Sequence, residues 1–112
     1  MTLPILSRKL TLETPIRVAD GAGGYSIDWQ PMGTLWAEVK ARTGAEGSGV
    51  AVPLSKSRFT MTVRAAPIGS PSRPRPEQRF RDDTRLFAID AVVERDADAR
   101  FLTCYVTEEV AV

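Results

Sequence analysis

The side chains of this chain that could carry out chemistry are carboxylates, arginines and one thiol. Histidine is absent from the 112 residues, which removes the commonest general base and metal ligand, and a lone cysteine cannot build an ordinary zinc site. The carboxylates include two adjacent pairs, Asp82-Asp83 and Glu108-Glu109. Neighbouring residues on a strand point to opposite faces, so neither pair converges on one substrate. The sequence therefore predicts a protein that is not an enzyme and has no metal or cofactor. A small hydrolase using Asp82, Asp83 or Glu108 would need a substrate pocket that the sequence does not reveal.

Arginines are concentrated between residues 73 and 85, where five occur among three carboxylates. One interpretation is a solvated loop and edge strand whose charges pair with one another. The other is a patch that faces DNA phosphates or a neighbouring protein, formed by Arg73, Arg75, Arg79 and Arg81. With Arg58 and Arg64 added on the polar face of a strand, the second interpretation describes a small nucleic-acid-binding β-barrel.

The elements that would position these residues are β-strands, because apolar and polar residues alternate with a period of two. The alternating apolar sets are Leu10 and Leu12; Leu35, Ala37, Val39 and Ala41; Phe59, Met61 and Val63; Phe87, Ile89, Ala91 and Val93; and Leu102, Cys104 and Val106. A further strand is expected from Tyr25 to Trp29, interrupted by residues 30–33, while Pro15 ends the first strand or marks an edge. The pattern predicts an all-β fold, a small β-barrel or sandwich of about six antiparallel strands, in a single domain over residues 1–112.

Segments without alternation predict loops. Residues 20–24 and 95–98 have the composition of turns, and residues 67–77 form a loop rich in proline and arginine. Residues 43–56 carry three glycines and a proline, and we expect a long flexible loop there. Its small apolar cluster, Val50, Val52 and Leu54, could dock against another surface.

One aromatic residue lies on the wrong face for a core position. Trp36 shares its side of the strand with Glu38 and Lys40, so it points outward. Either a loop or the N-terminal arm, residues 1–7, covers the indole, or another subunit does. In the second case the subunit interface includes Leu3, Ile5, Leu6 and Trp36.

Overall composition sets the broad class. The chain has 43% hydrophobic and 26% charged residues and a net charge of +1, which is typical of a soluble globular domain without a global field for nucleic acid or membrane. Cys104, in phase with Leu102 and Val106, is expected to be a buried apolar residue. No apolar stretch is long enough for a transmembrane helix, so we expect a protein of a reducing cytoplasm that does not interact with membrane.

The order of several short motifs resembles the head-tail joining family of tailed phages and of phage-like gene transfer agents. The motifs are Leu10-Thr11-Leu12-Glu13 with Pro15, Asp20-Gly21-Ala22-Gly23-Gly24 with Trp29, Leu35-Trp36-Ala37-Glu38-Val39, Thr60-Met61-Thr62-Val63-Arg64, and Arg79-Phe80-Arg81 before Phe87-Ala88-Ile89-Asp90-Ala91-Val92. This sequence departs from the family in its proline- and arginine-rich insertion, residues 70–76.

The resemblance implies a structural neck protein, of the head completion, connector or stopper kind, that forms a homo-oligomeric ring. Its partners would be identical copies, a portal or adaptor ring protein, a tail terminator or tail protein, and the passing double-stranded DNA. Its place would be the neck of the particle and, before assembly, the host bacterial cytoplasm. The long loop would reach into the central channel and help to retain DNA through Gly44, Glu46, Gly47, Ser48, Gly49, Val50, Val52 and Leu54.

Overall fold

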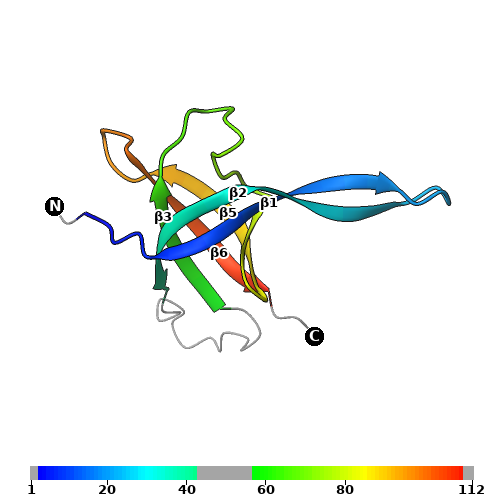
Figure 1. Cartoon of the computed structure of the whole chain (residues 1–112), viewed down its shortest axis with the longest axis horizontal. Coiled ribbons are helices and arrows are strands. Elements are labelled where there is room, and N and C mark those ends of the chain that lie inside the picture. The colour runs from blue at the N-terminus through cyan, green and yellow to red at the C-terminus, as the bar shows by residue number, and fades with distance from the viewer. Residues whose placement is uncertain (1–2, 43–56, 110–112) are drawn as a thin grey trace, which may run out of the picture.

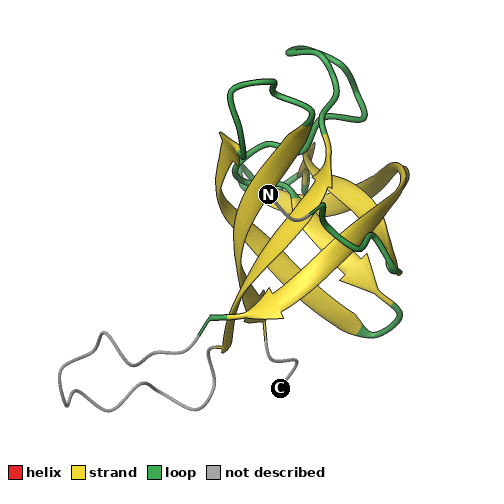
Figure 2. Cartoon of the chain, turned by 90° about the vertical axis from the view of Figure 1, so that its left-hand side faces the viewer, coloured by secondary structure: helices red, strands yellow, loops and turns green. Residues whose placement is uncertain are grey.

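The computed structural model describes residues 3–42 and 57–109, and within these ranges it contains strands and no helix. The strands are β1 (Arg8–Ala19), β2 (Tyr25–Ala41), β3 (Ser57–Arg64), β4 (Arg79–Asp82), β5 (Arg85–Glu94) and β6 (Phe101–Glu109). Neighbouring strands are antiparallel, and the order β1-β2-β3-β6-β5-β4 closes into a barrel because β4 also pairs with β1 (Figures 1 and 2). The predicted all-β fold is confirmed. No helix of the described ranges is long and apolar enough to cross a membrane.

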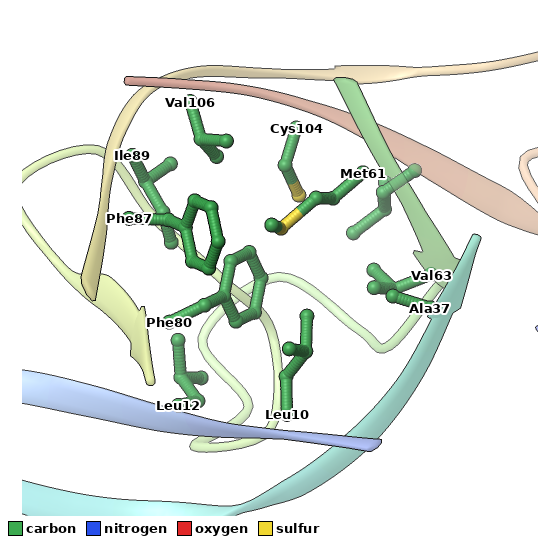
Figure 3. Close-up of a cluster of buried hydrophobic side chains, with 11 residues drawn as sticks. Leu10, Leu12, Ala37, Met61, Val63, Phe80, Phe87, Ile89, Cys104 and Val106 are labelled. Atoms are coloured by element: carbon green, nitrogen blue, oxygen red, sulfur yellow. The ribbon is translucent and has the colours of Figure 1, made fainter. Parts of the chain in front are cut away.

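The barrel interior is filled by inward-facing residues from all six strands, as period-two alternation requires. Phe80 and Phe87 are the largest fully buried side chains, and the ring of Phe87 packs edge-to-face against Phe59 with 5.5 Å between centroids. Burying a side chain of this kind contributes about 1.5–3 kcal/mol to stability. Figure 3 shows the side chains converging from different strands; the core consists of Leu10, Leu12, Ala37, Met61, Val63, Phe80, Phe87, Ile89, Leu102, Cys104 and Val106.

Cys104 lies within this core, which confirms the prediction of a small buried apolar residue. Burial disfavours the thiolate and raises the pKa of the Cys104 thiol to about 12. At neutral pH the side chain is therefore a protonated thiol with little nucleophilic character.

The first hairpin is longer than the barrel. β1 and β2 pair from Arg8 opposite Ala37 to Ala19 opposite Tyr25, but β4 pairs only with residues 11–13 of β1, and β3 only with residues 37–41 of β2. The distal halves, residues 14–19 and 25–30, therefore leave the barrel as a two-stranded ribbon, which extends to the right in Figure 1. We refer to these two segments as the ribbon.

The ribbon ends in the predicted glycine-rich turn. Asp20 Oδ1 accepts hydrogen bonds from the backbone N–H groups of Ala22, at 2.8 Å, and Gly24, at 3.0 Å. Gly21 and Gly23 have φ values of +80° and +87°, a region in which a Cβ is strained. The aspartate and the glycines together explain why the chain reverses here.

The predicted interruption of the second strand at residues 30–33 is wrong, because β2 continues through it. Leu12 lies opposite Gly33 and Glu13 lies opposite Pro31, so Met32 is an extra residue in a β-bulge. Gly33 accommodates the bulge with a φ of +127°. Pro15 marks an edge rather than an end, because β1 runs beyond it into the ribbon.

A second irregularity changes the predicted inward set of β5. The pairing with β6 shifts between Ile89 and Ala91. Beyond this point the even-numbered positions of β5 face the interior and the odd-numbered positions face outward. Val92 packs against the core, whereas Val93 is 45% exposed. The prediction that Val93 points inward was therefore wrong.

Candidate functional site

One end of the barrel carries the strand ends that flank residues 43–56. β2 ends at Ala41, β3 begins at Ser57, and the β4–β5 turn and the end of β6 lie at the same end (Figure 1). The turn and loop that join β5 to β6 and β3 to β4 lie at the opposite end (Figures 1 and 2). The two ends of the barrel are therefore different, because different connecting segments form them.

Arg42 fixes the chain where it leaves β2. Its Nε donates to the carbonyl oxygen of Phe59 at 3.2 Å and its Nη2 donates to that of Val106 at 2.8 Å. The guanidinium also lies 5.3 Å from the ring centroid of Tyr105, in cation–π geometry. The side chain thus ties β2 to β3 and β6 next to the departing segment.

A second arginine, Arg85, lies at the same end of the barrel, at the start of β5. Arg85 donates to both carboxylate oxygens of Glu108, at 2.8 and 3.0 Å, and its guanidinium lies 5.0 Å from the ring centroid of Phe87. The hydrogen bond from Arg85 lowers the pKa of the Glu108 carboxyl, and the same bond raises the pKa of Arg85. Both groups are therefore held in their charged forms.

The root of the ribbon is held by an ion cluster around a buried carboxylate. Glu13 lies directly after the bulge and is 5% exposed. It accepts from Arg79 Nε at 2.7 Å and from Arg81 Nε at 2.8 Å. The guanidinium of Arg79 also stacks 4.0 Å from the ring centroid of Trp29 in β2. These four residues, the root cluster, join β1, β2 and β4 at the point where the ribbon leaves the barrel.

The electrostatics of the root cluster favour the ionised carboxylate. Burial by itself would raise the pKa of Glu13, but the hydrogen bonds and charges of Arg81 and Arg79 outweigh it and lower the pKa below its ordinary value of 4.5. A carboxylate in this setting binds its two arginines at neutral pH and loses them in acid.

The four arginines named from the sequence occupy different environments. Arg79, which is buried, and Arg81, whose side chain is 42% exposed, both bind Glu13. Arg73 is half-buried and donates to the carbonyl oxygen of Ala66 at 2.9 Å, while Arg75 is exposed on the loop before β4. The structure therefore brings Arg79 and Arg81 together around a carboxylate and does not place all four on one open patch.

The candidate interface residues lie along the outer face of β2 and the segment before β1. Trp36 is 54% exposed, Leu3 is 63% exposed and Ile5 is 70% exposed, while Leu6 is half-buried. The backbone N–H of Ile5 donates to Glu38 Oε2 at 2.9 Å, which holds the N-terminal segment beside the strand that carries Trp36. The candidate channel residues, from Gly44 to Leu54, lie outside the described residues.

The carboxylates considered for hydrolysis are engaged elsewhere. Asp82 forms an ion pair with Arg8, Glu108 binds Arg85, and Asp83 occupies the β4–β5 turn with a φ of 57°.

One surface groove, at the ribbon root, is lined by Thr14, Pro15, Arg75, Pro76, Glu77 and Gln78. Within residues 3–42 and 57–109 no group of three or more metal-ligating side chains gathers.

Sequence reasoning missed the root cluster and the ribbon. Glu13 and the pair Arg79 and Arg81 are separated by 66 and 68 positions, so no local pattern connects them. One signal was present, because Arg79-Phe80-Arg81 places two charges on one face of a strand, opposite to the buried Phe80. Only the closure of the barrel shows that this face meets Glu13.

The described residues thus form a closed barrel with a projecting ribbon, and apolar side chains are exposed on several of its surfaces. The sequence model of the phage head completion protein family matches residues 1–109. The chain belongs to this family, and it is a virion structural protein of the phage type.

The solved structures that are similar to the chain include the following two. A chain from the virion of a native gene transfer agent particle shares 50% sequence identity with a TM-score of 0.80, covering 98% of this chain and 100% of that one. Protein SF1141 from Shigella flexneri 2a, solved in solution, shares 21% identity with a TM-score of 0.69 and full coverage of both chains, which shows a common fold. No functionally curated protein matches the chain.

Proposed function

We propose that this protein forms a homo-oligomeric ring in the neck of a tailed phage or gene transfer agent particle, where it joins the head to the tail and helps to retain packaged DNA. The observation that carries the proposal is the 50% identity, over 98% of the chain, to a component of a native gene transfer agent virion. The family match over residues 1–109 supports the same role. The ring neighbours would be a portal or adaptor protein on one side and a tail terminator or tail protein on the other, after assembly from the host cytoplasm.

The difference between the two ends of the barrel supports this role, because a ring between a head and a tail needs two different faces. One end bears Arg42 and Ser57, which flank the candidate channel loop, and the other bears residues 65–78 and the β5–β6 turn. The contacts of Arg42 with the carbonyl oxygens of Phe59 and Val106 anchor the start of that loop on two further strands.

Cryo-electron microscopy of the assembled particle tests the proposal directly. We expect density for this chain in a ring on the portal–tail axis, with the end that bears Arg42 and Ser57 directed toward the channel. Density for the chain elsewhere in the particle would overturn the proposal.

DNA retention is tested by shortening the candidate channel loop. Replacing residues 44–54 with a short glycine–serine linker should leave head-to-tail joining intact, because the change keeps every residue of the described strands β2 and β3. The particles should lose packaged DNA, measured as the nuclease-resistant DNA per particle. A matched control replaces residues 68–72, at the other end of the barrel, with a linker of the same composition. Unchanged DNA retention in the first variant would remove this role.

A further inference from the structure

The ribbon exposes apolar side chains from both of its strands. Ile16 and Val18 are each 39% exposed, Ile27 is 48% exposed and Tyr25 is 67% exposed. A two-stranded hairpin with both faces in water is marginally stable. The root cluster fixes where the ribbon starts, but within the described residues the ribbon beyond it has no covering strand. Its side chains are therefore available to another molecule.

The two faces of the ribbon differ in charge. Residues directly opposite each other in an antiparallel pair share a face, so Ile16 lies beside Asp28, and Val18 lies beside Ser26. Arg17 lies on the other face, where its guanidinium is 5.8 Å from the ring centroid of Tyr25. One face of the ribbon is therefore apolar and acidic.

An apolar and basic surface lies on the barrel, at the opposite end of β1. Lys9 is exposed directly opposite Trp36, and Leu3 and Ile5 are exposed in the segment that Glu38 holds beside β2. We refer to Leu3, Ile5, Lys9 and Trp36 as the Trp36 patch. From Lys9 to Val18, β1 extends over roughly 30 Å at about 3.3 Å per residue. In Figure 1 the N-terminal segment and the ribbon point to opposite sides of the barrel.

We infer that the acidic face of the ribbon of one copy docks on the Trp36 patch of the next copy in the ring. This inference rests on the proposed ring and names the surfaces that build it. The two surfaces match in chemistry, since each has apolar side chains beside charge of opposite sign. The ribbon face carries Asp28, whereas the patch carries Lys9 and lies beside Lys40, which is 70% exposed and pairs with the largely covered Glu38. Because they are different surfaces on opposite sides of one subunit, their contact is head-to-tail and repeats from copy to copy until the ring closes.

The backbone of the ribbon favours contact through side chains. Pro15 lies in the ribbon and Pro31 lies in β2 next to it, and neither can donate a hydrogen bond to an added strand. A neighbouring copy is therefore not recruited by extending the sheet along the whole ribbon. The exposed indole of Trp36 and the side chains of Ile16 and Val18 supply the contact instead.

Disulfide trapping in assembled particles tests the docking. A chain carrying both I16C and K9C should form, on mild oxidation, a reducible ladder of dimers, trimers and larger species. Each single variant should remain monomeric or stop at dimers. Cys104 does not compete, because it is buried in the core. The control pairs I16C with V93C, which moves the second thiol from the exposed Lys9 position to an exposed position on β5, outside the Trp36 patch.

The outcomes separate the docking from the ring. If the chain is present in the neck but I16C with K9C gives no ladder, or the V93C control gives an equal one, the docking is wrong and the ring proposal stands. If the chain is absent from the neck, both are wrong. A ladder confined to I16C with K9C supports both.

A charge exchange provides an independent test. D28K and K9E each place like charges together at the contact, so each should reduce incorporation of the chain into particles by roughly tenfold or more. The double variant restores opposite charges and should recover most of the incorporation, measured by quantitative immunoblot of purified particles. Equal losses in the double and single variants would overturn the pairing of Asp28 with Lys9.

Discussion

Glu13 is the buried carboxylate on which two arginines of the folded subunit meet. Its carboxylate binds Arg79 and Arg81, and Arg79 in turn stacks on Trp29, so three strands meet through three charged groups and one indole. Removing one partner of a buried ion pair costs about 3–5 kcal/mol, because the other charge is left without compensation. The cluster therefore matters both for the stability of the barrel and for the direction in which the ribbon leaves it.

The first prediction concerns E13Q. At neutral pH this variant leaves Arg79 buried with a neutral partner, and we expect the free energy of unfolding to fall by about 3 kcal/mol. The pKa of Glu13 is lowered in the folded state, so its contribution is fully present above pH 4.5, the ordinary value, and is lost as the pH falls through the folded value. The stability gap between wild type and E13Q should therefore narrow below pH 4.5.

Urea denaturation at pH 7, 5 and 3.5 measures this gap. E94Q, which changes an exposed carboxylate on β5, is the matched control and should stay close to wild type at every pH. A gap between E13Q and wild type that is equally large at all three pH values would contradict the electrostatic role of Glu13.

At the scale of the strands, the alternation in the sequence predicted most of the barrel wall, because inward and outward residues alternate on any half-buried strand. Met61, Val63, Leu102 and Cys104 all point inward as predicted. The bulge at Met32 was not predicted, because the proline and glycine on either side of it are also the local signs of a loop.

What the alternation could not predict depends on partner strands. The register shift next to Asp90 turns Val93 outward, and only the pairing of β5 with β6 reveals it. The contacts of Glu13 with Arg79 and Arg81 likewise need β1 and β4 to be neighbours, which is a consequence of barrel closure. Trp36 was placed correctly on the outer face, because that placement follows from period two alone.

The N-terminal segment gives the second prediction of this section. Deleting residues 1–6 removes the bond from Ile5 N–H to Glu38 and the exposed side chains of Leu3 and Ile5, but keeps the bond from Ser7 N–H to the carbonyl oxygen of Ala37. The loss of stability should be about 1–2 kcal/mol, since the lost hydrogen bond is exposed and the lost side chain of Leu6 is only half-buried. Incorporation into particles should fall much more, because half of the Trp36 patch is gone.

Thermal unfolding and an immunoblot of purified particles measure the two effects. I68A is the matched control, since it removes an apolar side chain that is 86% exposed on the loop before β4. A large loss of thermal stability in the truncated chain, with incorporation reduced only in proportion, would show that the segment belongs to the core of the subunit.

For the whole molecule, the distribution of charge decides how it meets DNA. The net charge is +1, and several arginines neutralise carboxylates within the subunit: Arg8 with Asp82, Arg79 and Arg81 with Glu13, and Arg85 with Glu108. Strong binding to duplex DNA requires several unpaired cations that displace counterions from phosphates. This charge distribution fits the proposed neck ring, because a wall that lets DNA pass and then retains it does not need to be strongly basic.

The last prediction is therefore that the isolated chain binds double-stranded DNA only weakly, with a dissociation constant on the order of 100 μM or higher at physiological salt. Fluorescence anisotropy of a labelled duplex at 50 and 200 mM salt measures both the affinity and its salt dependence. The double variant R58A/R64A removes two exposed cations from the outer face of β3 and should change the affinity little, because two phosphate contacts account for a small part of a binding site. Micromolar binding at 200 mM salt, with a salt slope that R58A/R64A flattens, would contradict this account and would instead support the nucleic-acid-binding barrel considered from the sequence.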